Sequence, residues 1–325
     1  MFKKLLFLIS IIVVCCVLVI RYIYNKIIDL YLVKDNELSY DCYMSHFIQI
    51  VSKNNYFMNY GLWDKTTANL REANENLVQF IFEKLNPHMK KEANILDVGC
   101  GYGEQDMVWS KKGGASGGKI TAIDISETQI GFANQLQKKE NISPHKLSFE
   151  VCNALNIHET YKADEFDVVL SLESAFHYSE RPKFFKNAAT VLKDDGVFII
   201  GDIMLKNDYK SSLLNDMFLK MFGDILHIPK ENLICVDEWK QNIVDAGFEI
   251  TEYNDITSQT FIPYYKHFFY TYMKNKYLPS VFAFPLNMIF YNTQPFNYVV
   301  AVCKKTAVSV VSDAVAATAE PPKIE

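Results

Sequence analysis

The fold of this chain is decided by the stretch Asn94-Ile95-Leu96-Asp97-Val98-Gly99-Cys100-Gly101-Tyr102-Gly103. A short apolar run is followed by glycine at every second position, which is typical of a buried strand that ends in a tight turn. Because glycine has no Cβ, such a turn lets the backbone pass close to a ligand. Residues 104–112 then predict a helix whose N-terminus faces the same ligand. The stretch therefore predicts a nucleotide-cofactor site at the tip of a first strand.

Residues around the turn distinguish between cofactors. A dinucleotide site needs the spacing G-x-G-x-x-G, and here Glu104 stands where the last glycine would be. Asp97 would be repelled by a pyrophosphate, but its carboxylate can bind the cationic end of an amino-acid-bearing nucleoside. Asp124 ends the second predicted strand and can bind both ribose hydroxyls, which fits an NAD site as well. The two acids together favour S-adenosylmethionine, and a nicotinamide oxidoreductase is an alternative.

Composition and charge exclude several classes of protein. The 325 residues suffice for one large domain, and hydrophobic and aromatic contents of 49% and 14% suffice for its core. A net charge of −5 gives no electrostatic footprint for nucleic acid. The cysteines are odd in number, scattered and without metal-ligand spacing, so we expect reduced thiols and no metal site.

The N-terminus carries a membrane signal. Residues 5–20 are apolar apart from Ser10 and are flanked by Lys3, Lys4 and Arg21. As a helix the run spans about 24 Å, so flanking side chains must reach the interface of a hydrocarbon core about 30 Å thick. No small-residue cleavage site follows, which favours an uncleaved anchor in residues 1–24 over a signal peptide. The charges leave the orientation open, but a cytosolic cofactor implies a cytosolic catalytic domain.

Two helical segments are expected before the first strand. Residues 25–65 predict an N-terminal helical cap that ends in Tyr60-Gly61-Leu62-Trp63. Residues 67–85 have apolar side chains at helical spacing, with Thr66 or Thr67 as N-cap, and Asn86-Pro87 ends this helix.

From residue 94 onward, strands and helices alternate, which predicts an α/β, Rossmann-like fold. We expect a seven-stranded, mainly parallel sheet with strands at 95–98, 119–124, 147–151, 166–171, 197–200, 248–253 and 297–303. Covering helices are expected at 126–139, 182–192 and 237–246, and residues 208–223 and 261–290 are expected to form an apolar lid. The domain should span residues 66–304, followed by a disordered tail at 305–325.

Several motifs of the chain resemble those of class I S-adenosylmethionine-dependent methyltransferases. Ile95 to Gly103 resembles the first motif, Asp124-Ile125-Ser126 with Gln129 the ribose-binding strand end, and Cys152-Asn153-Ala154 the adenine-contacting motif. Asn153 departs from the aspartate usual in the family, although its amide can still bond to adenine. The segment Leu170 to His177, with Arg181 and Val191 to Gly196, is similar to a small-molecule branch. That branch contains macrolide and sugar O-methyltransferases and, more distantly, tocopherol and sterol C-methyltransferases.

The resemblance implies a set of site residues over about residues 55–303. The cofactor-binding residues it implies are Tyr60, Asp97, Gly99, Cys100, Gly101, Asp124, Ile125, Gln129, Asn153, Ala154 and Leu172. Asn59 to Trp63 resembles the aromatic segment that closes over the cofactor, where the ring of Tyr60 can face the sulfonium.

Methyl transfer to oxygen also needs a general base. His177 follows the fourth predicted strand and Asp202 the fifth, so both are expected at the rim that faces the methyl group. In the sugar O-methyltransferases that the chain resembles, a His and an Asp at these positions are the candidate bases. Glu173 has two interpretations, a contact to the cofactor amino group or an acid on the substrate side.

The leading hypothesis is therefore a membrane-anchored methyltransferase that acts on an oxygen of a hydrophobic or lipid-like small molecule. The alternatives are C-methylation of a sterol- or prenylquinol-type acceptor, with Glu173 as the acid that handles a carbocation, and a catalytically silent, membrane-tethered binding protein. The sequence predicts neither the acceptor nor the oligomeric state.

Overall fold

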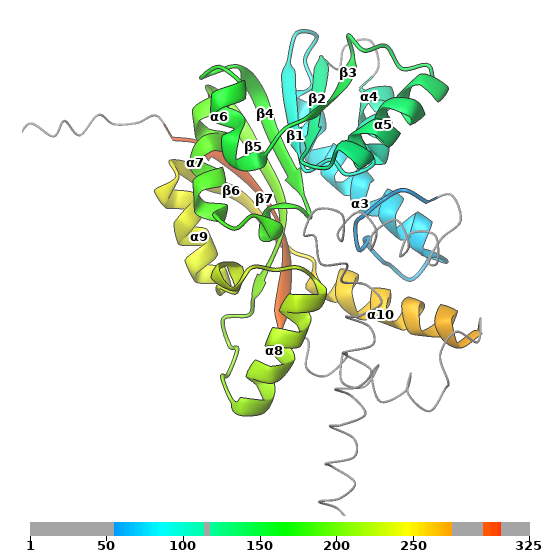
Figure 1. Ribbon diagram of the computed structural model, residues 1–325, viewed down its shortest axis with the longest axis vertical. Helices are drawn as coiled ribbons and strands as arrows, with labels where there is room; N and C mark the ends of the chain where they lie inside the picture. Colours follow the sequence, from blue (N-terminus) through cyan, green and yellow to red (C-terminus); the bar gives the residue numbers. More distant parts are fainter. Residues whose placement is uncertain (1–54, 114–117, 275–294, 307–325) are drawn as a thin grey trace, which may run out of the picture.

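The computed structural model describes residues 55–113, 118–274 and 295–306 (Figure 1). Its centre is a seven-stranded sheet in the order β3-β2-β1-β4-β5-β7-β6, which confirms the predicted Rossmann-like architecture. The strands are β1 (Asn94–Val98), β2 (Lys119–Asp124), β3 (Leu147–Val151), β4 (Phe166–Leu172), β5 (Leu192–Leu205), β6 (Phe248–Asp255) and β7 (Phe296–Lys305).

The sheet is parallel apart from β7, which runs antiparallel between β5 and β6. The chain reverses strand order after β3, because β1 pairs with β2 on one side and with β4 on the other. In such an open sheet the crevice outside the carboxyl ends of the strands at this point is where ligands bind. The glycine-rich turn follows β1 and therefore opens into that crevice.

Helices cover both faces of the sheet and one of its ends (Figure 1). One face is covered by α3 (Leu70–Leu85), α4 (Glu104–Lys112) and α5 (Glu127–Lys139), and the other by α6 (Ile157–Thr160), α7 (Arg181–Val191) and α9 (Val236–Asp245). The last two, α8 (Leu213–Ile225) and α10 (Thr257–Lys274), lie beyond the end of the sheet at which the parallel strands finish.

The strands are buried on both faces, which explains why they read as nearly continuous apolar runs. Ile95, Val168 and Ile199 point into the core beneath α3, α4 and α5. Leu96, Val169 and Phe198 point into the opposite core beneath α7 and α9. Neighbouring residues of one strand therefore belong to different cores, and this alternation fixes the direction in which polar side chains at the strand ends point.

The N-terminal part of the described chain departs from the prediction of a helical cap over residues 25–65. Residues 1–54 lie outside the described residues, and residues 55–65 contain no helix. Their backbone amides are bound elsewhere, since Tyr56 donates to Glu104, Tyr60 to Glu173 and Leu62 to the carbonyl of Ala73. These long-range partners replace the hydrogen bonds that a helix would make within itself, so the aromatic segment 55–63 is an extended strap.

The start of α3 and the end of β7 also differ from the predicted boundaries. Helix α3 begins later than expected, because Asn69 caps it by accepting from the amide of Glu72, while Thr66 and Thr67 both bond to Asp64. At the other end β7 extends to Lys305, whose Nζ lies 2.8 Å from Asp164, so the tail begins later than predicted. The predicted membrane anchor and residues 307–325 lie outside the described residues. Within the described ranges, no helix combines the length and apolar character needed to cross a membrane.

Candidate active site

The glycine-rich turn connects β1 to α4 in a conformation that needs glycine. Gly99, Gly101 and Gly103 all have positive φ, at 85°, 59° and 71°. At Gly103 a Cβ would also lie 2.3 Å from the ring of Phe149, so no side chain fits there. The amides of Gly99 and Cys100 donate to the carbonyl of Ile123 at 2.8 and 3.0 Å, which ties the turn to the end of β2.

Asp97 lies directly beneath this turn and is completely buried. Its Oδ2 accepts a 2.7 Å hydrogen bond from Gln105, whereas Oδ1 has no nitrogen or hydroxyl donor among the described residues. Burial raises the pKa of Asp97 to about 6, and burial together with Asp97 raises the pKa of Asp106 well above its usual value. Both oxygens of Asp106 also lack a nitrogen or hydroxyl donor among the described residues, so these two neighbouring buried carboxyl groups can receive a cation.

Asp124 ends β2 beside the same turn. Its Oδ2 accepts from the amide of Gly101 and its Oδ1 from the amide of Ser126, both at 3.0 Å, so the backbone orients the carboxylate. Ser126 caps α5 by accepting from the amide of Gln129, whose side chain is buried. Ile125 is 56% exposed between these two polar residues. A carboxylate next to an exposed apolar side chain suits a ribose whose base packs on the apolar surface.

The end of β3 carries the predicted adenine motif. The amide of Cys152 donates to the carbonyl of Asp124 at 3.0 Å, which keeps this loop close to the ribose site. Asn153 uses its Oδ1 to accept from the amide of Leu155 and so caps the short helix η3 (Ala154–Asn156), while Ala154 is buried. Cys100, in the turn, is also buried, and burial raises the pKa of its thiol. These residues shape the cofactor site, and the raised pKa keeps the thiol of Cys100 protonated.

Glu173 follows Leu172 at the end of β4 and has a strained backbone, with φ at 52°. Its amide donates to the carbonyl of Gly201, and its Oε1 accepts from the amide of Tyr60 at 2.8 Å and from the hydroxyl of Tyr298 at 2.7 Å. Burial raises the pKa of Glu173 to about 8, so the carboxyl group is mostly protonated at neutral pH. Glu173 therefore joins the strap to the sheet.

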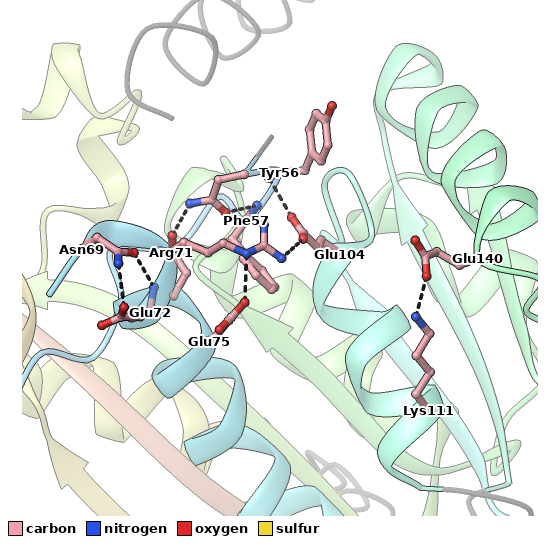
Figure 2. Close-up of polar contacts among 11 residues, drawn as sticks. Tyr56, Phe57, Asn69, Arg71, Glu72, Glu75, Glu104, Lys111 and Glu140 are labelled. Atoms are coloured by element: carbon pink, nitrogen blue, oxygen red, sulfur yellow. Dashed lines mark hydrogen bonds and ion pairs between the residues drawn. The ribbon is translucent and has the colours of Figure 1, made fainter. Parts of the chain in front are cut away.

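The strap passes next to the glycine-rich turn, where Sδ of Met58 would lie 3.0 Å from a Cβ on Gly101, and it is held at both ends. Figure 2 shows the contacts at its start. At its start, Glu104 accepts from the amide of Tyr56 through Oε2 and from Arg71 of α3 through Oε1, both at 2.7 Å. The ring of Tyr56 packs 4.6 Å from that of Phe132 on α5. At its end, Tyr60 is bound to Glu173 and its ring packs against Phe261 and Tyr264 of α10. Glu104 stands where a dinucleotide motif has its last glycine, and it anchors the strap next to the turn.

His177 lies in η4 (Ala175–His177), in the loop that leads from β4 to α7. Its Nδ1 is 3.1 Å from the carbonyl oxygen of His227, and its ring packs against that of Phe176. Burial lowers the pKa of His177 to about 4, so its imidazole is neutral at physiological pH. The structure therefore presents His177 as a neutral, oriented imidazole at the carboxyl end of β4.

Asp202 does not join His177 in a catalytic pair. Its side chain is fully buried and accepts from Arg181 at 3.1 Å, from the indole of Trp239 at 2.8 Å and from the amide of Ile203 at 2.9 Å. Among the described residues, none of its hydrogen bonds comes from His177. Although burial raises the pKa of Asp202, Arg181 favours its charged form. Of the two candidate bases, Asp202 is thus part of a buried ion pair with Arg181.

Several residues of the site were not singled out from the sequence. Gln105 and Asp106 directly follow the glycine-rich turn, so their position next to the predicted site was a signal that could have found them. Tyr298, His227 and Trp239 lie far along the chain from the residues that they contact, and no local pattern marks them.

Comparisons with known proteins agree with this geometry. Residues 89–255 match the family model described as a methyltransferase domain. The chain is 30% identical to erythromycin 3''-O-methyltransferase of Saccharopolyspora erythraea over 64% of this chain and 67% of that protein. It is 27% identical to 27-O-demethylrifamycin SV methyltransferase of Amycolatopsis mediterranei over 68% of this chain and 76% of that protein.

Solved structures share the fold at low sequence identity. A putative sarcosine dimethylglycine methyltransferase from Galdieria sulphuraria aligns with a TM-score of 0.67 and 14% identity, covering 81% of this chain and 98% of that one. Geranyl diphosphate C-methyltransferase from Streptomyces coelicolor, solved with S-adenosyl-L-homocysteine, aligns with a TM-score of 0.62 and 14% identity, covering 81% and 98%.

The residues around the turn fit the cofactor of this family. Asp97 offers a buried acceptor to the ammonium group of S-adenosylmethionine, and Asp124 offers an oriented carboxylate to its ribose. The match over residues 89–255 and the two relatives confirm the predicted family and cofactor. The chain belongs to the methyltransferase domain family and is an S-adenosylmethionine-dependent methyltransferase.

Proposed function

We propose that the protein methylates a hydroxyl oxygen of a hydrophobic small molecule, with His177 as the general base. The observation that supports this most is the 3.1 Å contact between Nδ1 of His177 and the carbonyl oxygen of His227. A carbonyl oxygen only accepts, so Nδ1 carries the proton of the neutral ring and Nε2 carries the lone pair. The imidazole is therefore in the tautomer that a base at Nε2 requires.

A weakly basic imidazole is sufficient for this reaction. When bound, S-adenosylmethionine supplies an electrophilic methyl group on a sulfonium centre. A hydroxyl oxygen that gains a methyl group becomes strongly acidic, so even an imidazole with a pKa of about 4 can take its proton. His177 accepts this proton at Nε2 and afterwards passes it to solvent. Because the ring is neutral above that pKa, we expect no loss of rate between about pH 6 and pH 7.

The other two candidate catalytic residues, Glu173 and Asp202, are less suited to the role of base. Glu173 is mostly protonated at neutral pH, and Asp202 is committed to Arg181. The protonation of Glu173 also weakens the alternative of C-methylation, because only its ionised form would stabilise a carbocation or remove a proton from one.

The acceptor class follows from the surroundings of the site and from the relatives. Leu213 and Met217 of α8 are exposed, so this helix offers apolar surface beyond the end of the sheet, and Phe261 and Tyr264 of α10 make the surroundings of Tyr60 apolar. The names of the two relatives refer to O-methylation of erythromycin and to a demethylated rifamycin, both small molecules. We propose that this chain, like these relatives, acts on a small molecule, and that it transfers the methyl group to an oxygen.

Labelling of an unknown acceptor tests this function. The full-length protein is incubated with methyl-labelled S-adenosylmethionine and a fractionated apolar extract, and the labelled product is identified. A methyl ether is expected. His177→Ala should lower turnover roughly 100-fold or more without changing the affinity for S-adenosylhomocysteine, whereas the exposed control His145→Ala should do neither. Label on carbon would establish the C-methylation alternative, and cofactor binding without transfer would support a silent binding protein.

We also propose that residues 1–24 tether the enzyme to a membrane, with the catalytic domain in the cytosol. The apolar run between Lys4 and Arg21 is the feature that supports this. In isolated membranes the full-length protein should resist extraction with alkaline carbonate, and its catalytic domain should be digested by protease added from the cytosolic side. Complete release by carbonate would contradict the tether.

A further inference from the structure

The segment after α8 makes one hydrogen bond with the ring of His177 and two with the backbone of the residues on either side of it. The carbonyl of His227 accepts from Nδ1 of the His177 ring. Five residues further on, Asn232 donates from Nδ2 to the carbonyl oxygens of Phe176 at 2.9 Å and Tyr178 at 2.6 Å. These are the carbonyl groups of the residues on either side of His177. The loop therefore sets both the backbone position of His177 and the orientation of its ring.

An asparagine is chemically specified at this position. The two carbonyl groups need two N–H donors, and an amide nitrogen carries two. The side chain of Asn232 is 2% exposed, so water does not substitute for it, and an aspartate would place an acceptor against two acceptors. The same requirement assigns the amide orientation, since only Nδ2 can donate to both oxygens.

Asn232 is fixed in turn by the buried ion pair. Its backbone carbonyl accepts from Arg181 at 3.1 Å, and Arg181 also donates to Asp202 and to the carbonyl of Ile203, both at 3.1 Å. Trp239 of α9 donates to the same oxygen of Asp202. A continuous set of hydrogen bonds thus leads from the end of β5 through Arg181 and Asn232 to the backbone around His177.

We infer that Asn232, anchored by the Arg181–Asp202 pair, is the positioning residue that holds His177 in its base-competent orientation. The inference rests on the proposed role of His177 as base. It also gives Asp202 a role different from that of a base, because Asp202 acts on the reaction only through Arg181 and Asn232. Since His227 contributes its backbone carbonyl and has φ at 50°, glycine should replace it without loss of the contact.

Histidine side-chain NMR of the full-length protein tests this without any acceptor. The ring nitrogens of ¹⁵N-labelled histidine report tautomer and titration, and His177→Gln assigns the resonances. The wild type should show Nδ1 protonated and no titration of His177 near pH 6.5. In Asn232→Ser the Nδ1–H tautomer should lose its dominance and the titration should move toward pH 6.5. His227→Gly should retain the Nδ1–H tautomer, because the backbone carbonyl of residue 227 is kept, although the pKa of His177 should rise with the loss of the neighbouring imidazole.

Asn187→Ser is the matched control, because Asn187 is also buried and donates to a backbone carbonyl, that of Leu155, at 2.8 Å. It should leave His177 unchanged. If Asn232→Ser does not fold, Asn232→Asp keeps the side-chain volume and should give the same change at His177. Wild-type tautomer and titration in a folded Asn232 variant would overturn the inference. The proposed function fails independently, if His177→Ala transfers methyl groups at the normal rate.

Discussion

Replacing Glu173 by glutamine is expected to remove a pH-dependent loss of stability from this protein. The carboxyl group of Glu173 accepts hydrogen bonds from Tyr60 and Tyr298 through one oxygen, and burial raises its pKa from 4.5 to about 8. Glutamine has the same shape and keeps an oxygen for both donors, but it does not ionise. The substitution therefore isolates the effect of the charge.

The size of the pH-dependent loss of stability follows from the pKa of Glu173 in the unfolded chain, 4.5, and in the folded protein, about 8. Because the pKa is higher in the folded protein than in the unfolded chain, the folded state binds the proton more tightly. This stabilisation is complete below pH 4.5, is lost progressively as the pH rises from 4.5 to about 8, and is absent above that. Each pH unit in the interval removes about 1.4 kcal/mol, so the total from this carboxyl is at most about 5 kcal/mol.

Urea unfolding between about pH 5 and pH 9 measures the effect. The free energy of unfolding of Glu173→Gln should exceed that of the wild type by an amount that grows with pH and levels off near pH 8. Asp97 and Asp106 titrate in both proteins, so they cancel in the difference. The matched control Glu249→Gln, at an exposed position of β6, should show no such trend. A difference between the wild type and Glu173→Gln that does not change with pH would refute the reasoning.

Three further predictions concern the ion pair, the cofactor site and the turn. Asp202→Asn should lower the free energy of unfolding by about 3 to 5 kcal/mol in urea titrations, because Arg181 loses its buried counter-charge. Methyl transfer per folded molecule should fall less in this variant than in His177→Ala. A variant that is inactive but as stable as the wild type would instead support Asp202 as the base. Asp97→Asn should weaken the binding of S-adenosylhomocysteine by roughly ten- to a hundredfold in calorimetry. The affinity of the wild type should fall as the pH drops through about 6, where Asp97 becomes protonated. An unchanged affinity in Asp97→Asn would exclude Asp97 from the site. Gly103→Ala should lower the melting temperature, because the φ of 71° and the contact with Phe149 cost about 2 to 4 kcal/mol of folding free energy. The control Gly131→Ala in α5, where a Cβ would meet no described atom within 4 Å, should be neutral or stabilising. Equal effects of the two substitutions would contradict the turn geometry.

The positions of Asp97 and Asp124 could be read from the sequence because each lies at or near the end of a parallel strand. The carboxyl ends of parallel strands meet at one edge of the sheet, so topology alone brings the two acids together there. The glycine spacing predicted the turn for an equally local reason, since the three positive φ angles need residues without Cβ.

The partners of Asp202 and of the strap could not be read in this way. Asp202 was predicted to follow the fifth strand, but it lies within β5, which extends to Leu205 and pairs Asp202 with Val299 of β7. Its side-chain partners Arg181 and Trp239 are 21 and 37 residues away in the chain. The residues before the Tyr60-Gly61-Leu62-Trp63 turn were predicted to be helical, yet residues 55–59 form no helix and the amide of Tyr60 donates to Glu173, 113 residues further on. Such contacts depend on which elements pack together, and no residue spacing encodes them.

The sequence by itself determined the fold class and the edge of the sheet at which the cofactor binds, because strand periodicity, glycine spacing and strand-end acids act over a few residues. The family was indicated by the resemblance of its motifs. Only the tertiary structure decided the burial and the hydrogen-bond partners of the three candidate bases. It separated His177 from Asp202, bound Asp202 to Arg181 and buried Glu173 beneath the strap. The physical reason is that protonation and orientation depend on burial and on hydrogen-bond partners, and these are set by segments distant in the chain.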